Sequence, residues 1–497
     1  MSPIRAAGCR RNSLGANCNR WGRHLRLTEL ITALEEYVLV DPNGSIENTE
    51  VDSLVMDHRE TDQQSAFFAL AGSHFDGHDY VKDAYDRGAP VAFVQHHVES
   101  EIPQVILSSG NPRAQLALLS ATLWRKPSEE LTVLGVTGTN GKTTSVHMLS
   151  SILRSLGVKT DALGTLWGRL TTPEAPELQR KLREFKDAGA DAVAMEVSSH
   201  SLVMHRVDGV SFQAALFTNL SQDHLDFHHD METYFRAKAM LFDPVRSEMG
   251  IVNQDDPYGQ VLLDKRSDLI PYSIRDTKNL ELDRSGIRFS WRGHLISSPL
   301  NGVHNVYNIL GVLTTLVALE CDESALSEAV PLVGTPNGRM ELIANDLPIS
   351  VFVDYAHTPA ALEAALLACR TLSPKRVLVV FGCGGERDKQ KRPKMGSVAS
   401  ALADATVVTS DNSRNEDPAE IAREVLSGIA AGSEVILELD RQRAIELAIN
   451  MAGEGDLVLI AGKGHETTQR SQGKEAHFDD HEVARQILKS KFGWSLS

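Results

Sequence analysis

The segment "LTVLGVTGTNGKTTS", residues 131–145, restricts the possible folds more than any other part of the sequence. Val133–Thr137 is a short, mainly apolar run that predicts a buried strand. After the glycine-rich loop, apolar residues recur on one face of a predicted helix: Val146, Leu149, Ile152, Leu153 and Leu156. Gly157 is a typical helix-ending residue. A strand that turns through glycines directly into a helix predicts an α/β fold with a parallel sheet.

The loop between that strand and helix has the residue types of a phosphate-binding site. The standard pattern places a glycine five positions before the Gly-Lys pair, but Val136 stands there and the additional glycine is Gly138. Gly138 and Gly141 let backbone N–H groups face an anion, and the helix N-terminus adds positive potential. Lys142 can then reach the terminal phosphates of a nucleotide, and the Thr143 hydroxyl can bind Mg²⁺. A plain glycine turn is the alternative.

The length of 497 residues is too great for one core and predicts two to four domains. Residues 1–27 are expected to form a disordered basic tail, because six arginines precede the first acidic residue, Glu29, and no apolar segment is present. An over-long start and a transit peptide are the alternatives. The remainder is expected to form an N-terminal domain over 28–128, a central domain over 129–335 and a C-terminal domain over 336–497.

The last of these domains repeats one pattern four times. Apolar runs end in polar and glycine-rich residues in "ISVFVDYAH", "KRVLVVFGCGG", "DATVVTSDN" and "DLVLIAGKGHE". In open parallel sheets, ligands bind at the carboxyl ends of the strands, where such residues meet. The sequence therefore predicts a second ligand site there.

Composition excludes several classes of partner. A formal charge of -16 argues against a nucleic-acid partner, and no run reaches the ~18 apolar residues of a membrane helix. The five cysteines, Cys9, Cys18, Cys321, Cys369 and Cys383, lack the spacing of a disulfide framework or a zinc site. A monomer in the reducing cytoplasm is expected.

Three polar residues downstream of the loop suggest a magnesium site when they are considered together. Glu196 ends the apolar run "DAVAMEV", His224 follows another predicted strand in "TNLSQDHLDFHHD", and Lys238 lies on a predicted helix in "YFRAKAMLF". Singly, His224 is as well explained by an ordinary histidine, and Lys238 by a solvated helix face. A buried carboxylate such as Glu196 needs a positive partner.

Ten motifs in order and spacing make the chain similar to the Mur ligase family over about residues 28–490. They are "GTNGKTT", "TTPE", "MEVSSH", "TNLSQDHLDFH", "YFRAK", "NGRMELI", "DYAHTPAAL", "GCGGERDKQKRP", "SDNSRNEDP" and "GKGHE". The resemblance implies three domains, which bind the UDP group, ATP and the incoming amino acid. It also implies a reaction in which ATP phosphorylates a carboxylate and an amine then attacks the acyl phosphate.

The closest members of that family add meso-diaminopimelate to UDP-N-acetylmuramoyl-L-alanyl-D-glutamate, a peptidoglycan precursor. The resemblance therefore implies this activity, with ATP and Mg²⁺ as cofactors. Three alternatives remain: the same reaction with L-lysine, a decayed ligase that only binds nucleotide or precursor, and a folylpolyglutamate synthetase. The last lacks a domain like residues 28–128.

The family's functional residues carry over to matching positions here. Those implied to bind ATP are Gly138, Thr139, Asn140, Gly141, Lys142, Thr143, Thr144, Asn305, Asn308, Arg339 and Asp354. Those implied to bind the UDP-muramoyl dipeptide are His58, Thr171, Thr172, Ser198 and Arg206. Those implied to bind the amino acid are Arg387, Asp411, Asn412, Ser413, Arg414, Gly462 and Glu466.

The resemblance also implies a catalytic group made of Lys142, Glu196, His224 and Lys238. Thr143, Glu196 and His224 are the implied metal ligands, and Lys238 is implied to be carbamylated, since a lysine ammonium would repel a metal ion. Without the resemblance, the asparagine pair Asn305 and Asn308 would be interpreted as a helix cap and Arg339 as a surface charge.

Several positions depart from the family pattern. His58 stands where the family has a serine near the uracil pocket, Met204 stands where glutamine is common, and the stretch before Thr171 is shortened. Ser413 replaces the proline of Asp-Asn-Pro-Arg, which is expected to loosen that loop. Arg414 fits the second carboxylate of diaminopimelate, and the alternative is a surface pair with Glu416 or Asp417.

Overall fold

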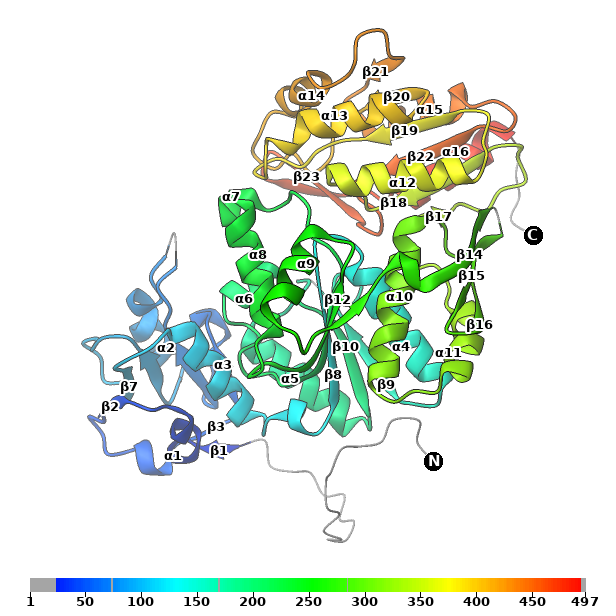
Figure 1. Ribbon diagram of the computed structural model, residues 1–497. Coiled ribbons are helices and arrows are strands. Elements are labelled where there is room, and N and C mark those ends of the chain that lie inside the picture. The colour runs from blue at the N-terminus through cyan, green and yellow to red at the C-terminus, as the bar shows by residue number, and fades with distance from the viewer. Residues whose placement is uncertain (1–23, 73–74, 169, 284, 493–497) are drawn as a thin grey trace. The chain divides into compact units, whose positions relative to one another are not determined.

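Figure 1 shows the computed structural model, which describes residues 24–72, 75–168, 170–283 and 285–492. The chain divides into two compact units. The first holds the described residues up to Gly135, with Val158–Ala215 and Met240–Met249, and the second holds Val136–Gly157, Leu216–Ala239 and the described residues from Gly250 onward.

Ordered structure begins earlier than the sequence predicts. Most of the predicted tail, residues 1–23, lies outside the described residues. Strand β1 (Leu25–Arg26), however, pairs with β3 (Glu50–Val51), and Leu27, which opens helix α1 (Leu27–Leu30), is fully buried. These apolar side chains pack in the N-terminal core, although they lie just before the predicted boundary at residue 28.

The N-terminal part of the chain forms a small α/β unit. Its five-stranded sheet has the order β2 (Tyr37–Val40), β7 (Gln104–Leu107), β6 (Ala92–Val94), β5 (Ser65–Phe68) and β4 (Ser53–Val55). The strands pair in parallel except for β2. Helices α2 (Val81–Asp86) and α3 (Pro112–Leu123) follow β5 and β7. Phe68 and Phe93 stack in the core.

A second, six-stranded sheet carries the phosphate loop. Its order is β13 (Ile270–Tyr272), β12 (Ser247–Asn253), β11 (Phe212–Phe217), β8 (Thr132–Thr137), β10 (Ala192–Glu196) and β9 (Thr160–Leu163). Its helices are α4 (Lys142–Ser155), α5 (Ala175–Asp187), α6 (Ser199–Val203), α7 (Leu225–His228), α8 (Met231–Ala239), α9 (Pro257–Lys265) and α10 (Val303–Ala318). The predicted strand and helix around the loop are confirmed as β8 and α4.

A three-stranded antiparallel sheet that lies between these elements along the chain was not predicted from the sequence. It consists of β14 (Thr277–Asp283), β15 (Gly286–Trp291) and β16 (His294–Ser298), and helix α11 (Glu323–Ala329) follows α10. Strand β14 alternates half-buried and exposed residues and has few apolar ones. Such a strand is hard to recognise because it covers only one side of a small core.

The C-terminal part is a doubly wound sheet with the order β17 (Glu341–Leu342), β18 (Ser350–Asp354), β22 (Leu457–Ala461), β19 (Val377–Phe381), β20 (Ala405–Val408) and β21 (Val435–Leu437). All neighbours are parallel except β17 and β18. One face packs on α12 (Pro359–Thr371), α13 (Lys391–Leu402) and α14 (Pro418–Leu426). The other packs on α15 (Arg441–Met451) and α16 (Asp480–Phe492).

The four predicted strands of this domain are β18, β19, β20 and β22, so their polar ends meet at one edge of the sheet. A separate hairpin, β23 (Thr468–Ser471) and β24 (Lys474–His477), follows β22. The hairpin was not predicted from the sequence.

Candidate active site

The phosphate loop can hold only glycine at two of its positions. At Gly138, with φ +148°, a Cβ would lie 1.9 Å from Thr218 Oγ1. At Gly141, with φ +86°, a Cβ would lie 2.4 Å from Asn308 Oδ1. Helix α4 begins directly after Gly141, and this N-cap glycine has no side chain that could cover the helix N-terminus. The loop therefore places backbone N–H groups at a helix N-terminus, as an anion-binding loop requires.

The segment after β11 holds the middle of the loop in place. The Asn140 N–H donates to Asn219 Oδ1 at 3.0 Å, and the Thr139 hydroxyl donates to the Ser221 carbonyl at 3.1 Å. Thr143 and Thr144 follow within α4 and are both buried. Neutral hydrogen bonds from this segment thus help to fix the loop conformation.

Two lysines converge on one backbone carbonyl of the loop. Lys142 Nζ donates to the Gly138 and Thr139 carbonyls at 2.8 Å each, and Lys238 Nζ donates to Gly138 O at 2.8 Å. Lys238 is 1% exposed and lies over the Tyr234 ring. Its burial and the nearby Lys142 ammonium hold the pKa of Lys238 well below its ordinary value. Lys238 does not lie on a solvated helix face, which excludes that interpretation.

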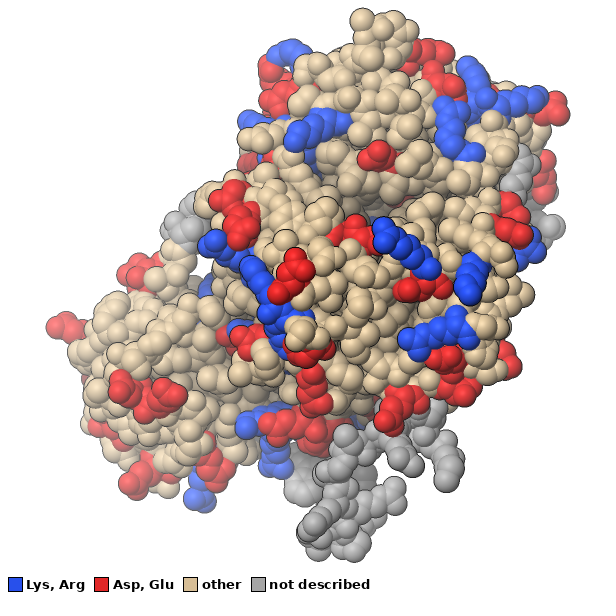
Figure 2. Space-filling model, viewed as in Figure 1, with Lys and Arg blue, Asp and Glu red and all other residues tan. Residues whose placement is uncertain are grey.

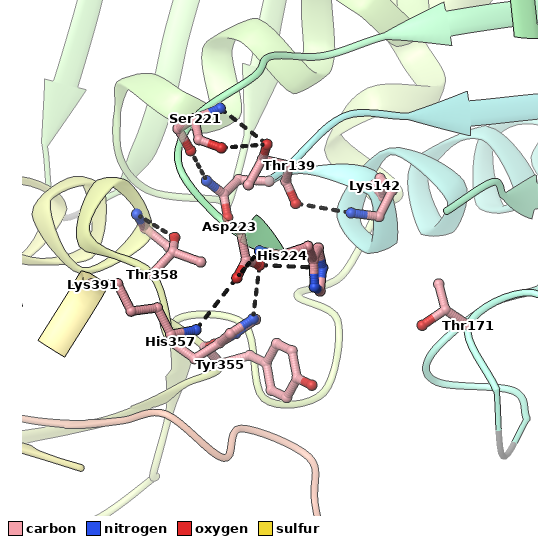
Figure 3. A network of polar contacts seen from close by, with 12 residues as sticks. Thr139, Lys142, Thr171, Ser221, Asp223, His224, Tyr355, His357, Thr358 and Lys391 are labelled. Atoms are coloured by element: carbon pink, nitrogen blue, oxygen red, sulfur yellow. Dashed lines mark hydrogen bonds and ion pairs between the residues drawn. The ribbon is translucent and has the colours of Figure 1, made fainter. Parts of the chain in front are cut away.

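His224 lies beside Asp223, which is the centre of a polar network (Figure 3). Asp223 Oδ2 is 3.3 Å from His224 Nε2 and 3.7 Å from His357 Nε2, and its Oδ1 is 3.4 Å from Lys391 Nζ. Burial by itself would raise the pKa of Asp223, but the Lys391 ammonium and the two imidazoles hold it well below the ordinary value. Asp223 is therefore a buried carboxylate that carries its charge at neutral pH.

Sequence reasoning missed this network, although its members stand in motifs that it used. Asp223 directly precedes His224, His357 belongs to "DYAHTPAAL", and Lys391 belongs to "GCGGERDKQKRP". They come from the segment after β11, the end of β18 and the start of α13. Nothing local in the sequence links three positions so far apart.

Asn305 and Asn308 lie inside α10 and not at its cap. The N-cap of α10 is Gly302, whereas the Asn305 side chain donates to the Asn301 carbonyl and Asn308 Nδ2 donates to Asn305 Oδ1. Both side chains are buried, and the Asn308 amide packs on the phosphate loop at Gly141. The helix-cap interpretation is wrong, because the pair fills the space between a helix and the loop.

Arg339 joins the phosphate loop to the C-terminal sheet. Its Nη2 donates to Thr143 Oγ1 at 2.9 Å, and its guanidinium lies 4.4 Å from the centre of the Tyr355 ring. Its Nε is buried and has no hydrogen-bond partner within the described part of the chain. The surface-charge interpretation is therefore wrong. The arginine stacks on an aromatic ring at the nucleotide loop, with a buried donor that suits a ligand acceptor.

Asp354 ends β18 and fixes the segment that carries Arg339. Its two carboxylate oxygens accept from the Met340 N–H at 2.7 Å and the Ala356 N–H at 2.8 Å. Burial raises the pKa of Asp354 in spite of the nearby Arg339 guanidinium. In this structure Asp354 holds the backbone at Met340 and Ala356, and the Arg339 side chain is directed to the phosphate loop.

Glu196 belongs to the other compact unit and has neutral partners there. It is 1% exposed and accepts from the Thr165 N–H at 2.9 Å and the Thr165 hydroxyl at 3.3 Å. A Cβ at Gly164 would lie 2.4 Å from Glu196 Oε1. Glycine and threonine at these two positions therefore make room for the carboxylate and hold it.

Four of the five residues predicted to bind the muramoyl dipeptide form one hydrogen-bonded group with Glu196: Thr171, Thr172, Ser198 and Arg206. The Thr172 hydroxyl donates to the Glu196 carbonyl at 2.9 Å and lies 3.3 Å from Ser198 Oγ, and the Thr165 and Thr171 hydroxyls are 3.2 Å apart. Arg206 donates to the Thr172 carbonyl at 3.1 Å and pairs with Glu174 at 2.6 Å. Glu174 stands in "TTPE", but the sequence analysis assigned no role to it or to Thr165.

His58 lies in the N-terminal sheet region and stacks on Tyr80. The two ring centres are 4.5 Å apart and the planes differ by 3°. His58 opens a short 3-10 helix that Asp57 caps by accepting from the Arg59 N–H. At the position where the family has a serine hydroxyl, this chain therefore has the His58 ring, which is stacked on Tyr80.

Two residues predicted to bind the amino acid, Asn412 and Glu466, contact each other directly. Asn412 Nδ2 donates to Glu466 Oε2 at 2.8 Å, and the same oxygen lies 3.2 Å from Lys463 Nζ. The Tyr355 hydroxyl donates to Glu466 Oε1 at 3.3 Å. Lys463 is fully buried and was missed by sequence reasoning, although it stands in "GKGHE". Gly462 packs close to the Asp411 carboxylate, which a Cβ would approach to 2.8 Å.

Arg414 and Arg387 face the same glycine-rich loop. A Cβ at Gly384 would lie 3.2 Å from Arg414 Nη1 and 3.9 Å from Arg387 Cγ, and Arg414 Nη1 donates to the Gly385 carbonyl. Burial, with the neighbouring Arg387 charge, lowers the pKa of Arg414. The two guanidinium groups repel each other, and a bound carboxylate would reduce this repulsion because it is attracted to both. The pair is therefore suited to binding a carboxylate.

The alternative of a surface pair between Arg414 and Glu416 or Asp417 is wrong. Glu416 pairs with the buried Arg392 at 3.0 Å and with Lys389 at 3.3 Å. Asp417 caps α14 by accepting from the Ala419 N–H. Both carboxylates are thus engaged by other groups, which leaves Arg414 directed at the glycine loop.

On the face shown in Figure 2, acidic and basic side chains are interspersed. No helix in the described ranges is long and apolar enough to cross a membrane. Cys321, Cys369 and Cys383 are buried free thiols. The described residues contain no group of three or more His, Cys, Asp and Glu that could hold a metal ion.

Comparison with known proteins agrees with this geometry. The models of the Mur ligase middle domain, the Mur ligase glutamate ligase domain and the Mur ligase family catalytic domain match residues 136–316, 338–464 and 50–122. A relative from Aquifex aeolicus, named as a UDP-N-acetylmuramoyl-L-alanyl-D-glutamate--2,6-diaminopimelate ligase, is 40% identical over 88% of this chain and 94% of its own length. The chain belongs to the Mur ligase family.

Solved structures show the same architecture. One titled as a UDP-N-acetylmuramoyl-L-alanyl-D-glutamate--2,6-diaminopimelate ligase has a TM-score of 0.65 and 28% identity, and the match covers 93% of this chain and 99% of that one. The MurF ligase of Thermotoga maritima in complex with ADP has a TM-score of 0.61 and 20% identity, with 88% and 97% covered, and shows the fold alone. The three-domain Mur ligase architecture is confirmed, while the domain boundaries stay a prediction.

Proposed function

We propose that this Mur ligase is an ATP-dependent ligase that joins meso-diaminopimelate to UDP-N-acetylmuramoyl-L-alanyl-D-glutamate in peptidoglycan precursor synthesis. The observation that carries the proposal is the 40% identity to the Aquifex aeolicus diaminopimelate ligase over nearly the full length of both chains. Arg414 and Arg387, side by side at a strand-end loop, fit the additional carboxylate of this amino acid.

The proposed reaction brings a carboxylate against a triphosphate, and each of its two steps breaks one bond and forms one. The carboxylate attacks the γ-phosphorus of ATP, ADP leaves, and the resulting acyl phosphate is attacked by the amine, with loss of inorganic phosphate and a proton. Lys142, at the start of α4, balances phosphate charge. Thr139, Asn140 and Thr144 shape the loop, and Asn305, Asn308, Arg339 and Asp354 hold the nucleotide.

Mg²⁺ would be held by Thr143, Glu196, His224 and a carbamylated Lys238. When bound, it supplies positive charge that neutralises the crowded phosphate oxygens. The donor set fits such an ion, because hydroxyl, carboxylate and carbamate oxygens are the ligands that Mg²⁺ prefers. The lowered pKa of Lys238 favours the neutral form of its amine, which is the form that adds to CO₂.

We further propose that His58, Thr171, Thr172, Ser198 and Arg206 bind the UDP-muramoyl dipeptide, with the His58 and Tyr80 ring pair beside the uracil. Asp411, Asn412, Ser413, Gly462 and Glu466 complete the amino-acid site, in which Glu466 suits an ammonium group. The enzyme is proposed to act as a monomer in the cytoplasm, where free buried thiols are stable.

A phosphate-release assay tests the proposal. The full chain is given ATP, Mg²⁺, UDP-N-acetylmuramoyl-L-alanyl-D-glutamate and one of several amino acids, among them meso-diaminopimelate, L-lysine and L-ornithine. We expect release with meso-diaminopimelate and at least a hundredfold slower release with Lys142→Ala, the size of losing one charge-stabilising group. Equal release with L-lysine would favour the lysine-adding alternative, and no release with any amino acid would favour a decayed ligase.

A further inference from the structure

The hairpin β23–β24 is a small ribbon that stands apart from the six-stranded sheet. Its strands pair from Thr468 with His477 to Ser471 with Lys474, which leaves Gln472 and Gly473 as the turn. Both turn residues have positive φ, +49° and +72°. Positive φ at both positions is typical of the two-residue turn whose twist matches that of the flanking strands. The turn and the strand pairing therefore favour one well-defined hairpin.

Strand β23 of the hairpin forms hydrogen bonds with the loop after β20. Gln469 Nε2 donates to Ser410 Oγ at 3.0 Å and to the Asp411 carbonyl at 3.2 Å. The Arg470 N–H donates to Asn412 Oδ1 at 2.9 Å. Hydrogen bonds from one strand thus reach the loop residues that precede Arg414.

Backbone bonds to the hairpin also hold Arg414 itself. Its N–H donates to the Arg470 carbonyl at 3.1 Å, its carbonyl accepts from the Gln472 N–H at 2.5 Å, and it forms a parallel bridge with Ser471. Arg414 has φ +52°. For a residue other than glycine this left-handed conformation is strained, so it persists only where the surroundings fix it. Here the hairpin fixes it.

Ser413 makes the remaining link, at the position where the family pattern has proline. Its Oγ lies 3.0 Å from Ser471 Oγ, and its side chain is 1% exposed. Proline stiffens a loop by fixing φ, whereas this hydroxyl pair ties the loop to a neighbouring strand. The loop is therefore held from outside, which corrects the expectation that serine loosens it.

We propose that the hairpin Thr468–His477, through the Ser413–Ser471 hydroxyl pair and its bonds to Arg414, positions this arginine and so sets the selectivity for an amino acid with a second carboxylate. The proposal rests on the proposed function. Ser413 and Ser471 are positioning residues. They act through Arg414, whose guanidinium points toward Gly384 and Arg387.

The test compares kcat/KM for meso-diaminopimelate and L-lysine in Ser471→Ala and Ser471→Thr. We expect Ser471→Ala to lower kcat/KM for meso-diaminopimelate about fivefold through KM, the size of one hydrogen bond, and to leave the values for L-lysine and ATP unchanged. Ser471→Thr, which keeps the hydroxyl, should restore the preference. The matched control is Ser427→Ala, because this exposed serine bonds only its own helix at Glu424 O.

A compensation test separates positioning from general damage. Ser413→Pro introduces the residue of the family pattern, and it should make the enzyme insensitive to Ser471→Ala, because the ring then supplies the rigidity. An unchanged preference in Ser471→Ala, or equal losses for both amino acids, would overturn the proposal. If the unaltered chain releases no phosphate with any amino acid, the proposed function fails instead, so the two failures are distinguishable.

Discussion

Arg441 and Asp480 form an ion pair from which water is fully excluded. Arg441 Nε lies 2.8 Å from Asp480 Oδ1 and Nη2 lies 2.7 Å from Oδ2, and both side chains are 0% exposed. The two residues open α15 and α16. The guanidinium also donates to the Ser410 and Ala461 carbonyls, which directly precede Asp411 and Gly462. The ion pair therefore holds the backbone of two loops that belong to the proposed amino-acid site.

Removing one partner of this pair should destabilise the C-terminal domain. We expect Asp480→Asn to lower its free energy of unfolding by about 3–5 kcal/mol, because a buried guanidinium loses its counter-charge. Urea unfolding followed by circular dichroism measures the change. Arg443→Ala, on the helix that carries Arg441, is the control, since that side chain is 73% exposed and should change stability by less than about 1 kcal/mol. Similar midpoints for the two variants would contradict the prediction.

Carbamylation of Lys238 predicts chemical rescue. Lys238→Ala should lose at least about a hundredfold in turnover, since the proposed metal site loses an anionic ligand, and short-chain carboxylates should restore part of it. Phosphate release with and without added acetate measures this. ¹³C-bicarbonate should give a carbamate NMR signal in the unaltered chain that is absent in Lys238→Ala. The exposed Lys126→Ala serves as control, and full activity of Lys238→Ala would remove the proposed role.

Replacing Arg414 should abolish the preference for meso-diaminopimelate. We expect Arg414→Ala to lower kcat/KM for this amino acid about a hundredfold and to leave that for L-lysine nearly unchanged, because hydrogen bonds between charged groups are worth up to ~3 kcal/mol. Competition between the two amino acids at equal concentration is the measurement. Arg423→Ala, an exposed arginine of α14, is the control. A preference that survives in Arg414→Ala would show that another group recognises the carboxylate.

The pair between Glu341 and His481 predicts a pH dependence of stability. His481 Nε2 lies 2.8 Å from Glu341 Oε2. Burial alone would lower the pKa of His481, but the hydrogen bond and charge of Glu341 raise it above the ordinary 6.5. The stabilisation from His481 is therefore complete below about pH 6.5 and is lost as the pH rises through the folded-state pKa.

The hydrogen bond from His481 lowers the pKa of Glu341 below the ordinary value of 4.5. The stabilisation from the Glu341 carboxylate is therefore complete above about pH 4.5, and it is lost as the pH falls through the folded-state pKa. Both contributions are complete between about pH 4.5 and 6.5. His481→Gln should therefore cost about 1–2 kcal/mol at pH 5.5 and less at pH 9, as measured by thermal unfolding. A cost that is the same at both pH values would show that the pair stabilises without the charge on His481.

Local chemistry allowed much of this structure to be predicted. The phosphate loop is a local feature, since Gly138, Gly141 and Lys142 belong to one turn between a strand and a helix. The parallel strands were recognisable because each is an apolar run that ends in polar residues. The sequence also predicted that Asp411 and Gly462 lie close together, because both follow parallel strands and the carboxyl ends of such strands share one edge of the sheet.

The sequence by itself determined the elements and the kinds of residue at their ends, because short-range backbone preferences and apolar periodicity are encoded locally. Only the tertiary structure decided which of those ends contact one another and form a site together. Asp223 and Lys391 are 168 positions apart, and Ser413 and Ser471 are 58 apart. Such pairs form because the sheets and the hairpin bring distant segments together, and the packing that does so depends on the whole chain and leaves no signal in either segment alone.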